Sequence, residues 1–212
     1  MAETKNYCSK DEYKLMFWDG DVDDHQDDEM LDLIIPAVSR EIDRLTFTRF
    51  FTTDDNETRY FTPNHTEEIN LPIDLLSINT MKTDEDGDRT YEITWQTTDY
   101  DLLPFNALVD LEPFRDIRIS PAGSYAFPLV QKGLQISGKF GYCSSDNIDI
   151  WAAEIKMACL LGCHRIVKRL DTPLGISGVS GMVQPQLQVQ IPKLQSDPDW
   201  WSLVAPYRVI SR

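Results

Sequence analysis

The sequence has few cysteines for its length, four among 212 residues, and none of them forms a CxxC pair. Four scattered cysteines are too few for a disulfide scaffold in a chain of this size. We therefore expect the cysteines to be reduced. No apolar run approaches the roughly 20 residues that a membrane-spanning helix needs. The first residues carry charge and lack the apolar core of a signal peptide. These absences predict a soluble protein that is synthesised in a cytoplasm.

Basic residues are also scarce, because 20 Lys and Arg stand against 35 Asp and Glu, giving a net charge of -15. The excess of acids is uneven: residues 148–212 carry +2, and the first 147 residues carry -17. A surface this acidic repels phosphate backbones, which argues against direct nucleic-acid binding. It would suit a surface past which DNA slides, although high net charge also serves solubility alone.

The residues that usually carry catalysis are few. There are three histidines, and the sequence has neither a nucleotide-binding glycine loop nor a G-x-S-x-G motif. Cys159 and Cys163, one helical turn apart and followed by His164, could begin a metal site. A fourth ligand is missing, and cysteine is among the most often buried residue types, so core packing is favoured. We therefore predict no enzyme activity, no cofactor and no metal.

Two acidic stretches resemble calcium loops. The first, from Asp19 to Glu29, reads DGDVDDHQDDE, but an EF-hand would need Gly and Glu where Asp24 and Met30 stand. Its end suits the first turn of a helix, where the free N–H groups and the helix dipole favour carboxylates. The second, Asp84 to Asp88, lacks the bidentate Glu of an EF-hand and predicts a hairpin turn.

Helical patterns stand at both ends of the chain. A capping box at Ser9 predicts a short first helix, and an apolar stripe with period 3.6 predicts a second from about Asp27 to Thr46. Pro36 lies within that stripe and predicts a kink or a later start. A third helix, apolar almost all round, is expected over 148–170, and a short last helix after Asp197.

Between these helices the apolar period changes to two. Strands are predicted at 59–61, 76–81, 91–95, 117–119 and 134–140. The predicted fold class is α+β: residues 1–51 and 143–212 form a helical core with a C-terminal arm, and residues 52–142 form an inserted β-rich subdomain. Within the arm, an alternating apolar pattern predicts an intersubunit strand or an extended arm that carries Leu187, Val189 and Ile191.

Several strings of residues, in order along most of the chain, resemble the head-tail connector proteins of tailed bacteriophages. The similarity is to the adaptor that forms a ring beneath the portal. The strings are DEYKL (11–15), SREIDRLTFTRFF (39–51), ETRYF (57–61), LLSINTMKTDEDGDRTYE (75–92), TDYDLLPFNA (98–107), KRLDTPLG (168–175) and DPDWWSLVAPYR (197–208).

The resemblance implies a structural virion protein of the neck, made in the host cytoplasm, with no enzyme activity and no cofactor. It implies a homo-oligomeric, dodecameric ring that binds the portal protein on one side and a stopper or tail-completion protein on the other. DNA would pass through the ring during ejection without sequence-specific binding. The family commonly grips the portal with its C-terminal segment, which here carries Trp200, Trp201, Tyr207, Arg208, Val209 and Ile210.

Other interpretations remain open at this stage. The two tryptophans could anchor an interface or fold back onto the chain's own core. The protein could be a stopper or tail-completion protein of the same neck. From another class, it could be an acidic β-rich module that binds a basic partner by mimicking the charge of DNA.

Overall fold

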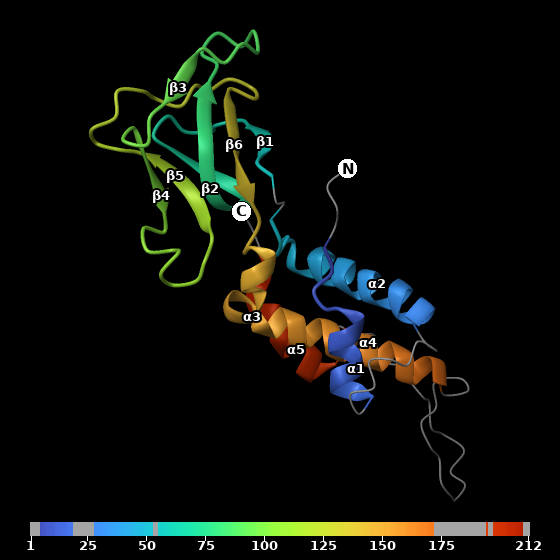
Figure 1. Cartoon of the computed structure of the whole chain (residues 1–212). Coiled ribbons are helices and arrows are strands. Elements are labelled where there is room, and N and C mark those ends of the chain that lie inside the picture. Colours follow the sequence, from blue (N-terminus) through green and yellow to red (C-terminus); the bar gives the residue numbers. More distant parts are fainter. Residues whose placement is uncertain (1–4, 19–27, 53–54, 172–193, 195–196, 210–212) are drawn as a thin grey trace, which may run out of the picture. The chain divides into compact units, whose positions relative to one another are not determined.

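The computed structural model describes residues 5–18, 28–52, 55–171, 194 and 197–209 (Figure 1). The chain forms two compact units. The helical unit comprises residues 6–47 and 153–208, and the sheet unit comprises residues 1–5, 48–152 and 209–212. Helices and one antiparallel sheet together confirm the predicted α+β class. The domain boundaries expected from the sequence, at 51/52 and 142/143, stay a prediction.

The helical unit contains segments from both ends of the chain. Helix α2 packs against α4, and both α1 and α5 contact this pair (Figure 1). Its buried apolar side chains come from all four helices. The elements are α1 (Lys10–Phe17), α2 (Asp28–Thr46), α4 (Ala153–Asp171), α5 (Pro198–Val204) and the 3-10 turn η4 (Ala205–Tyr207).

Local signals in the sequence set the starts of α1 and α5. The Ser9 side chain accepts from the backbone N–H of Glu12, whose carboxylate accepts from that of Ser9, which confirms the capping box. Asp197 caps α5 through the N–H groups of Asp199 and Trp200, as expected. Helix α2 begins at Asp28 and continues through Pro36, so the later start that we considered does not occur.

The helix expected over 148–170 is two helices. A 3-10 turn, η1 (Ser145–Asn147), leads into α3 (Ile148–Trp151), which ends at Ala152. Ala152 leaves the helical conformation with φ -149° and ψ 49°, and α4 begins at the next residue. The expectation of burial all round is also wrong, since Ile150 and Met157 are exposed. The apolar pattern in the sequence could not reveal the break at Ala152. The break falls at the boundary between the two compact units, since the sheet unit ends at Ala152 and the helical unit begins at Ala153.

The sheet unit contains one six-stranded sheet in the order β1-β6-β2-β5-β4, with β3 also paired to β2 (Figure 1). All pairings are antiparallel. The long strand β2 pairs with β5 through its first half and with β6 and β3 through its second half. The strands are β1 (Glu57–Phe61), β2 (Glu68–Thr83), β3 (Ile93–Trp95), β4 (Tyr100–Leu103), β5 (Phe114–Ile119) and β6 (Leu134–Phe140).

Each of the five strands expected from the sequence overlaps an observed strand, and the hairpin at Asp84–Asp88 joins β2 to β3 as predicted. The sequence missed β4 and the first half of β2. Pro72 lies in that first half and argues against a strand from sequence, because proline cannot donate a ladder hydrogen bond, and the register between β2 and β5 shifts in the same stretch. Trp95 stacks on Phe127 in the buried core of this unit, with ring centroids 4.9 Å apart. Within the described residues, no helix is both long enough and apolar enough to cross a membrane.

Candidate interface residues and a buried thiol cluster

The C-terminal helix places its two tryptophans differently. Trp200 is fully buried, and its indole Nε1 donates a hydrogen bond to the carbonyl oxygen of Ala158, 2.8 Å away on α4. Trp201 is partly exposed. The sequence left open whether the tryptophans anchor an interface or lie in the chain's own core. Trp200 lies in the core of its own unit, where it fixes α5 against α4. Trp201 keeps surface that a partner could contact.

The remaining sequence-predicted interface residues follow α5. Tyr207 is partly exposed, and its hydroxyl donates to the Glu154 carboxylate, 2.7 Å away. Arg208 is exposed and Val209 is partly exposed. Ile210 lies outside the described residues, as do the three residues of the predicted strand or arm, Leu187, Val189 and Ile191.

The loop between β4 and β5 exposes apolar side chains that the sequence reasoning did not single out. Phe105 is 71% exposed and Val109 is 81% exposed, and Leu108 and Leu111 are exposed as well. Backbone hydrogen bonds hold this loop in shape, from Val109 N to Asn106 O at 2.8 Å and from Glu112 N to Ala107 O at 2.8 Å. Four exposed apolar side chains within seven residues form a concentrated patch, where scattered single residues would be ordinary.

The acidic turn after β2 is organised by the backbone. Asp84 is buried, and its two carboxylate oxygens accept from the N–H groups of Gly87 and Arg89, each at 2.7 Å. Desolvation opposes its ionisation, but these hydrogen bonds outweigh it and hold the Asp84 pKa below the ordinary value of 3.8. Asp86 and Asp88 accept from backbone N–H groups two residues further on. The three carboxylates converge because they form the turn.

The other acidic stretch, Asp19 to Glu29, lies outside the described residues except for its end. Asp28 and Glu29 occupy the first turn of α2, as the helix-entry interpretation predicts. Asp28 also forms an ion pair with the buried ammonium of Lys14 on α1, 2.6 Å away. The end of this stretch therefore joins the first two helices electrostatically.

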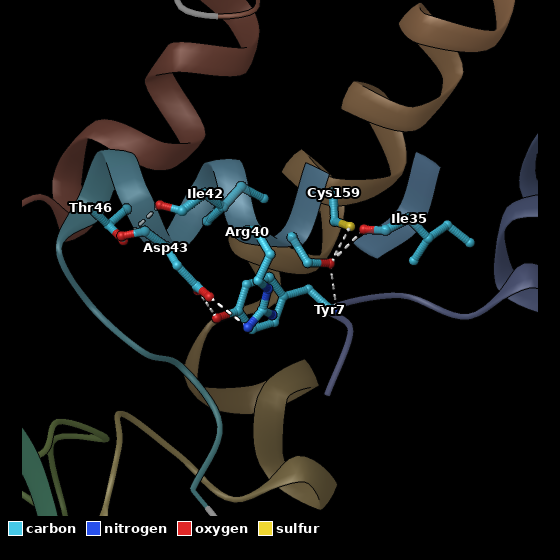
Figure 2. Close-up of polar contacts among 8 residues, drawn as sticks. Tyr7, Ile35, Arg40, Ile42, Asp43, Thr46 and Cys159 are labelled. Carbon is cyan, nitrogen blue, oxygen red and sulfur yellow. Dashed lines mark hydrogen bonds and ion pairs between the residues drawn. The ribbon is translucent and has the colours of Figure 1, made fainter. Parts of the chain in front are cut away.

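Residues just before α1 are fixed on α2 by polar contacts (Figure 2). The Tyr7 N–H donates to the Ser39 hydroxyl at 3.2 Å, and that hydroxyl donates to the Ile35 carbonyl at 2.8 Å. The Tyr7 hydroxyl donates to the Asp43 carboxylate, which also pairs with Arg40 at 2.9 Å. These contacts hold the backbone on either side of Cys8 in one position, since Ser9 is fixed by its capping box.

Three buried thiols meet in the helical unit. Cys159 and Cys163 lie one turn apart on α4, and the Cys8 sulfur lies 3.3 Å from the Cys159 sulfur. All three sulfurs lie within 4.8 Å of one another. The pair on α4 is recognisable in the sequence, but Cys8 is not, because 151 residues separate Cys8 from Cys159. His164, which follows the pair in the sequence, stacks on Phe17 with ring centroids 4.0 Å apart.

The sequence matches no protein-family model and no curated protein. Six solved chains match its structure, and three of them are described here. The chain described as "Neck of empty GTA particle computed with C6 symmetry" is 14% identical, with a TM-score of 0.47, over 89% of this chain and 82% of that chain. The chain from "Virion of native gene transfer agent (GTA) particle" is 13% identical, with a TM-score of 0.48, over 91% of this chain and 84% of that one.

The third chain is described as "Neck of native GTA particle computed with C12 symmetry". It is 13% identical, with a TM-score of 0.44, over 88% of this chain and 89% of that chain. The structural neighbours are thus chains of gene transfer agent particles, two of them described by the particle neck. At these identities and TM-scores the likeness carries no argument about what this chain does.

Proposed function

We propose that the protein is a structural component of the neck of a tailed phage or phage-like particle. In this role it is a head-to-tail adaptor, whose ring joins the portal to the stopper or tail and lines the DNA channel. The observation that carries the proposal is a helical unit built from segments near both ends of the chain, with most of the sheet unit lying between these segments in the sequence. This is the arrangement that the ordered sequence strings imply for a connector adaptor.

A ring subunit must present two different surfaces to its two neighbours. The apolar patch of the β4–β5 loop, formed by Phe105, Leu108, Val109 and Leu111, supplies exposed apolar area beyond the needs of one core. Strands β1 and β4 stand at the two ends of the sheet order, so each leaves one edge without a partner strand in that order. These features support assembly into a homo-oligomer, which we propose is a dodecamer.

Charge supports the proposed channel. The first 147 residues carry a net charge of -17, and their acids repel the phosphates of a passing DNA. A wall that repels DNA lets it slide without sticking, whereas a basic wall would retain it. The proposed role needs no catalysis and no cofactor.

For the portal we propose a contact surface that follows α5. Trp201, Tyr207, Arg208 and Val209 retain exposed area there, while the buried Trp200 positions the helix. Ile210 would extend this surface. Leu187, Val189 and Ile191 would serve as the strand or arm between neighbouring subunits.

The test is electron microscopy of the purified chain, alone and mixed with its cognate portal protein. Twelvefold rings stacked on the portal are the expected result, and Arg208→Glu should weaken the stacking because it reverses the charge of an exposed contact. Lys139→Glu in the sheet unit, also exposed, is the matched charge-reversal control and should stack normally.

Other outcomes would overturn the adaptor proposal. Rings or monomers that ignore the portal but bind the end of a tail tube would identify a stopper or tail-completion protein. A monomer that binds basic proteins in a salt-dependent way would identify an acidic module that mimics DNA.

A further inference from the structure

The three thiols of the helical unit form a cluster that the proposed neck function does not require. Cys8, Cys159 and Cys163 are all buried, and they come from two segments that are remote in the sequence. Buried cysteines often act simply as small apolar residues in a core. Here three sulfurs converge on one point, and each could supply a ligand atom to the same ion.

The distances suit a metal ion. With zinc–sulfur bonds of about 2.3 Å, two sulfurs on one ion lie about 3.8 Å apart in a tetrahedral site. The Cys8 and Cys159 sulfurs are 3.3 Å apart, and no pair in the cluster exceeds 4.8 Å. The sulfur–sulfur separation of a tetrahedral zinc site lies between these two values. Small side-chain rotations would therefore bring all three sulfurs to bonding distance of one ion.

The surroundings of the cluster hold its ligands in place. The Ser39 hydroxyl lies 3.5 Å from the Cys159 sulfur, and it is itself bonded to the Tyr7 N–H and the Ile35 carbonyl (Figure 2). Such outer contacts orient metal ligands and tune their affinity. Ser39 also offers an oxygen that could serve as a fourth ligand.

Among the residues that the structure describes, no imidazole belongs to the cluster. His164 directs its Nδ1 toward the Tyr13 hydroxyl, 3.2 Å away, and its ring stacks on Phe17. Within the described part of the chain, the ligand set is therefore three sulfurs with one neighbouring hydroxyl. Thiolate-rich sites select zinc and other thiophilic ions, while Mg²⁺ and Ca²⁺ require oxygen ligands.

The thiols already share their protons unequally. Hydrogen bonds from the Cys163 and Cys8 thiols lower the pKa of Cys159. The same hydrogen bonds with Cys159 raise the pKa of Cys8 and of Cys163. These opposite pKa shifts follow from the close approach of the three sulfurs.

We propose that Cys8, Cys159 and Cys163 bind a thiophilic divalent ion, Zn²⁺ in the cell. Entry of the ion displaces thiol protons to the solvent, forms metal–sulfur bonds and transfers no electrons. The bound ion would join the segment before α1 to the middle of α4. Because the ion binds the folded chain, it stabilises the helical unit by mass action.

The experiment uses the full chain, reduced and stripped of metal, with Cd²⁺ as a spectroscopic probe. We expect an ultraviolet thiolate-to-cadmium charge-transfer band that saturates at one ion per chain, and a rise in Tm on adding Zn²⁺. Cys8→Ala and Cys159→Ala should each lose the saturable band. Cys143→Ala is the matched control, because Cys143 is buried in the sheet unit, outside the thiol cluster, and it should keep the band.

Circular dichroism of each variant separates a lost ligand from a lost fold. Cys8→Ala is the variant best suited to show loss of a ligand without loss of the fold. Cys8 precedes α1, so its replacement should leave the contact between α2 and α4 intact. The proposal is overturned if the reduced wild-type chain gives no band, or if the band survives in the folded Cys8→Ala and Cys159→Ala variants. A chain that takes up no metal when reduced, but forms a Cys8–Cys159 disulfide when oxidised by air, would likewise overturn the proposal and identify a redox pair.

Discussion

The indole Nε1 of Trp200 donates a hydrogen bond to the carbonyl oxygen of Ala158, 2.8 Å away, and the Trp200 side chain is fully buried. This contact joins the last helix of the chain to α4 through a group that combines a large apolar area with one polar atom. Of the two roles that the sequence left open for Trp200, interface anchor or core residue, the structure places it in the helical core.

Replacing Trp200 by Ala should lower the free energy of unfolding by about 3–5 kcal/mol, because a large side chain leaves a cavity in a packed core. Trp200→Phe should cost less, since it keeps most of the apolar area but removes the donor to Ala158. Urea denaturation followed by circular dichroism measures both. Trp201→Ala is the matched control, and its partly exposed side chain should make the loss distinctly smaller. Equal losses for the two tryptophans would contradict this assignment.

Gly162 permits close packing of α4 on α2. A Cβ at this position would lie 2.8 Å from Val38 Cγ1 and 3.2 Å from Trp200 Nε1. Gly162→Ala gains up to about 1 kcal/mol in helix propensity, but overpacking costs about 1–3 kcal/mol. We expect net destabilisation in urea denaturation.

A second substitution should relieve that contact. Val38→Ala removes the methyl group that the new Cβ would meet, so the double variant should lose less stability than the sum of the two single variants. A coupling of about 0.5–3 kcal/mol is typical of residues in contact. If the stability losses of the two single variants simply add in the double variant, Val38 does not limit the space for a side chain at position 162.

Asp84 should make stability depend on acid pH. Its folded-state pKa lies below the ordinary 3.8, so its contribution is complete above pH 3.8 and is lost as pH falls through the lower folded-state value. Asp84→Asn should reduce stability at neutral pH and flatten the decline in acid. Urea denaturation as a function of pH checks this. Glu85→Gln, an exposed neighbour in the same turn, should leave the profile unchanged.

The apolar loop between β4 and β5 should drive self-association. Val109→Asp and Phe105→Asp each place a charge on the exposed patch and should reduce the assembled fraction in analytical ultracentrifugation. Their effect on the unfolding free energy should remain within about 0.5 kcal/mol, as for ordinary surface substitutions. Leu129→Asp, at an exposed apolar residue outside the patch, is the control. If Leu129→Asp dissociates the assembly as strongly as Val109→Asp, the patch has no special role.

The sequence by itself determined what depends on neighbours along the chain. The capping box at Ser9, the Asp197 cap and the Asp84–Asp88 turn each bond to backbone groups within five residues, so their residue types alone predicted them. The apolar stripe of α2 likewise predicted its buried face, because helical spacing fixes which residues share a side.

Only the tertiary structure decided what depends on segments remote in sequence. The break at Ala152 falls where one compact unit ends and the next begins. The burial of Trp200 depends on α4 standing beside α5, and the thiol cluster depends on Cys8 returning to α4 across 151 residues. Neither propensity nor periodicity encodes such contacts, since burial and proximity belong to the packed chain and not to any window of it.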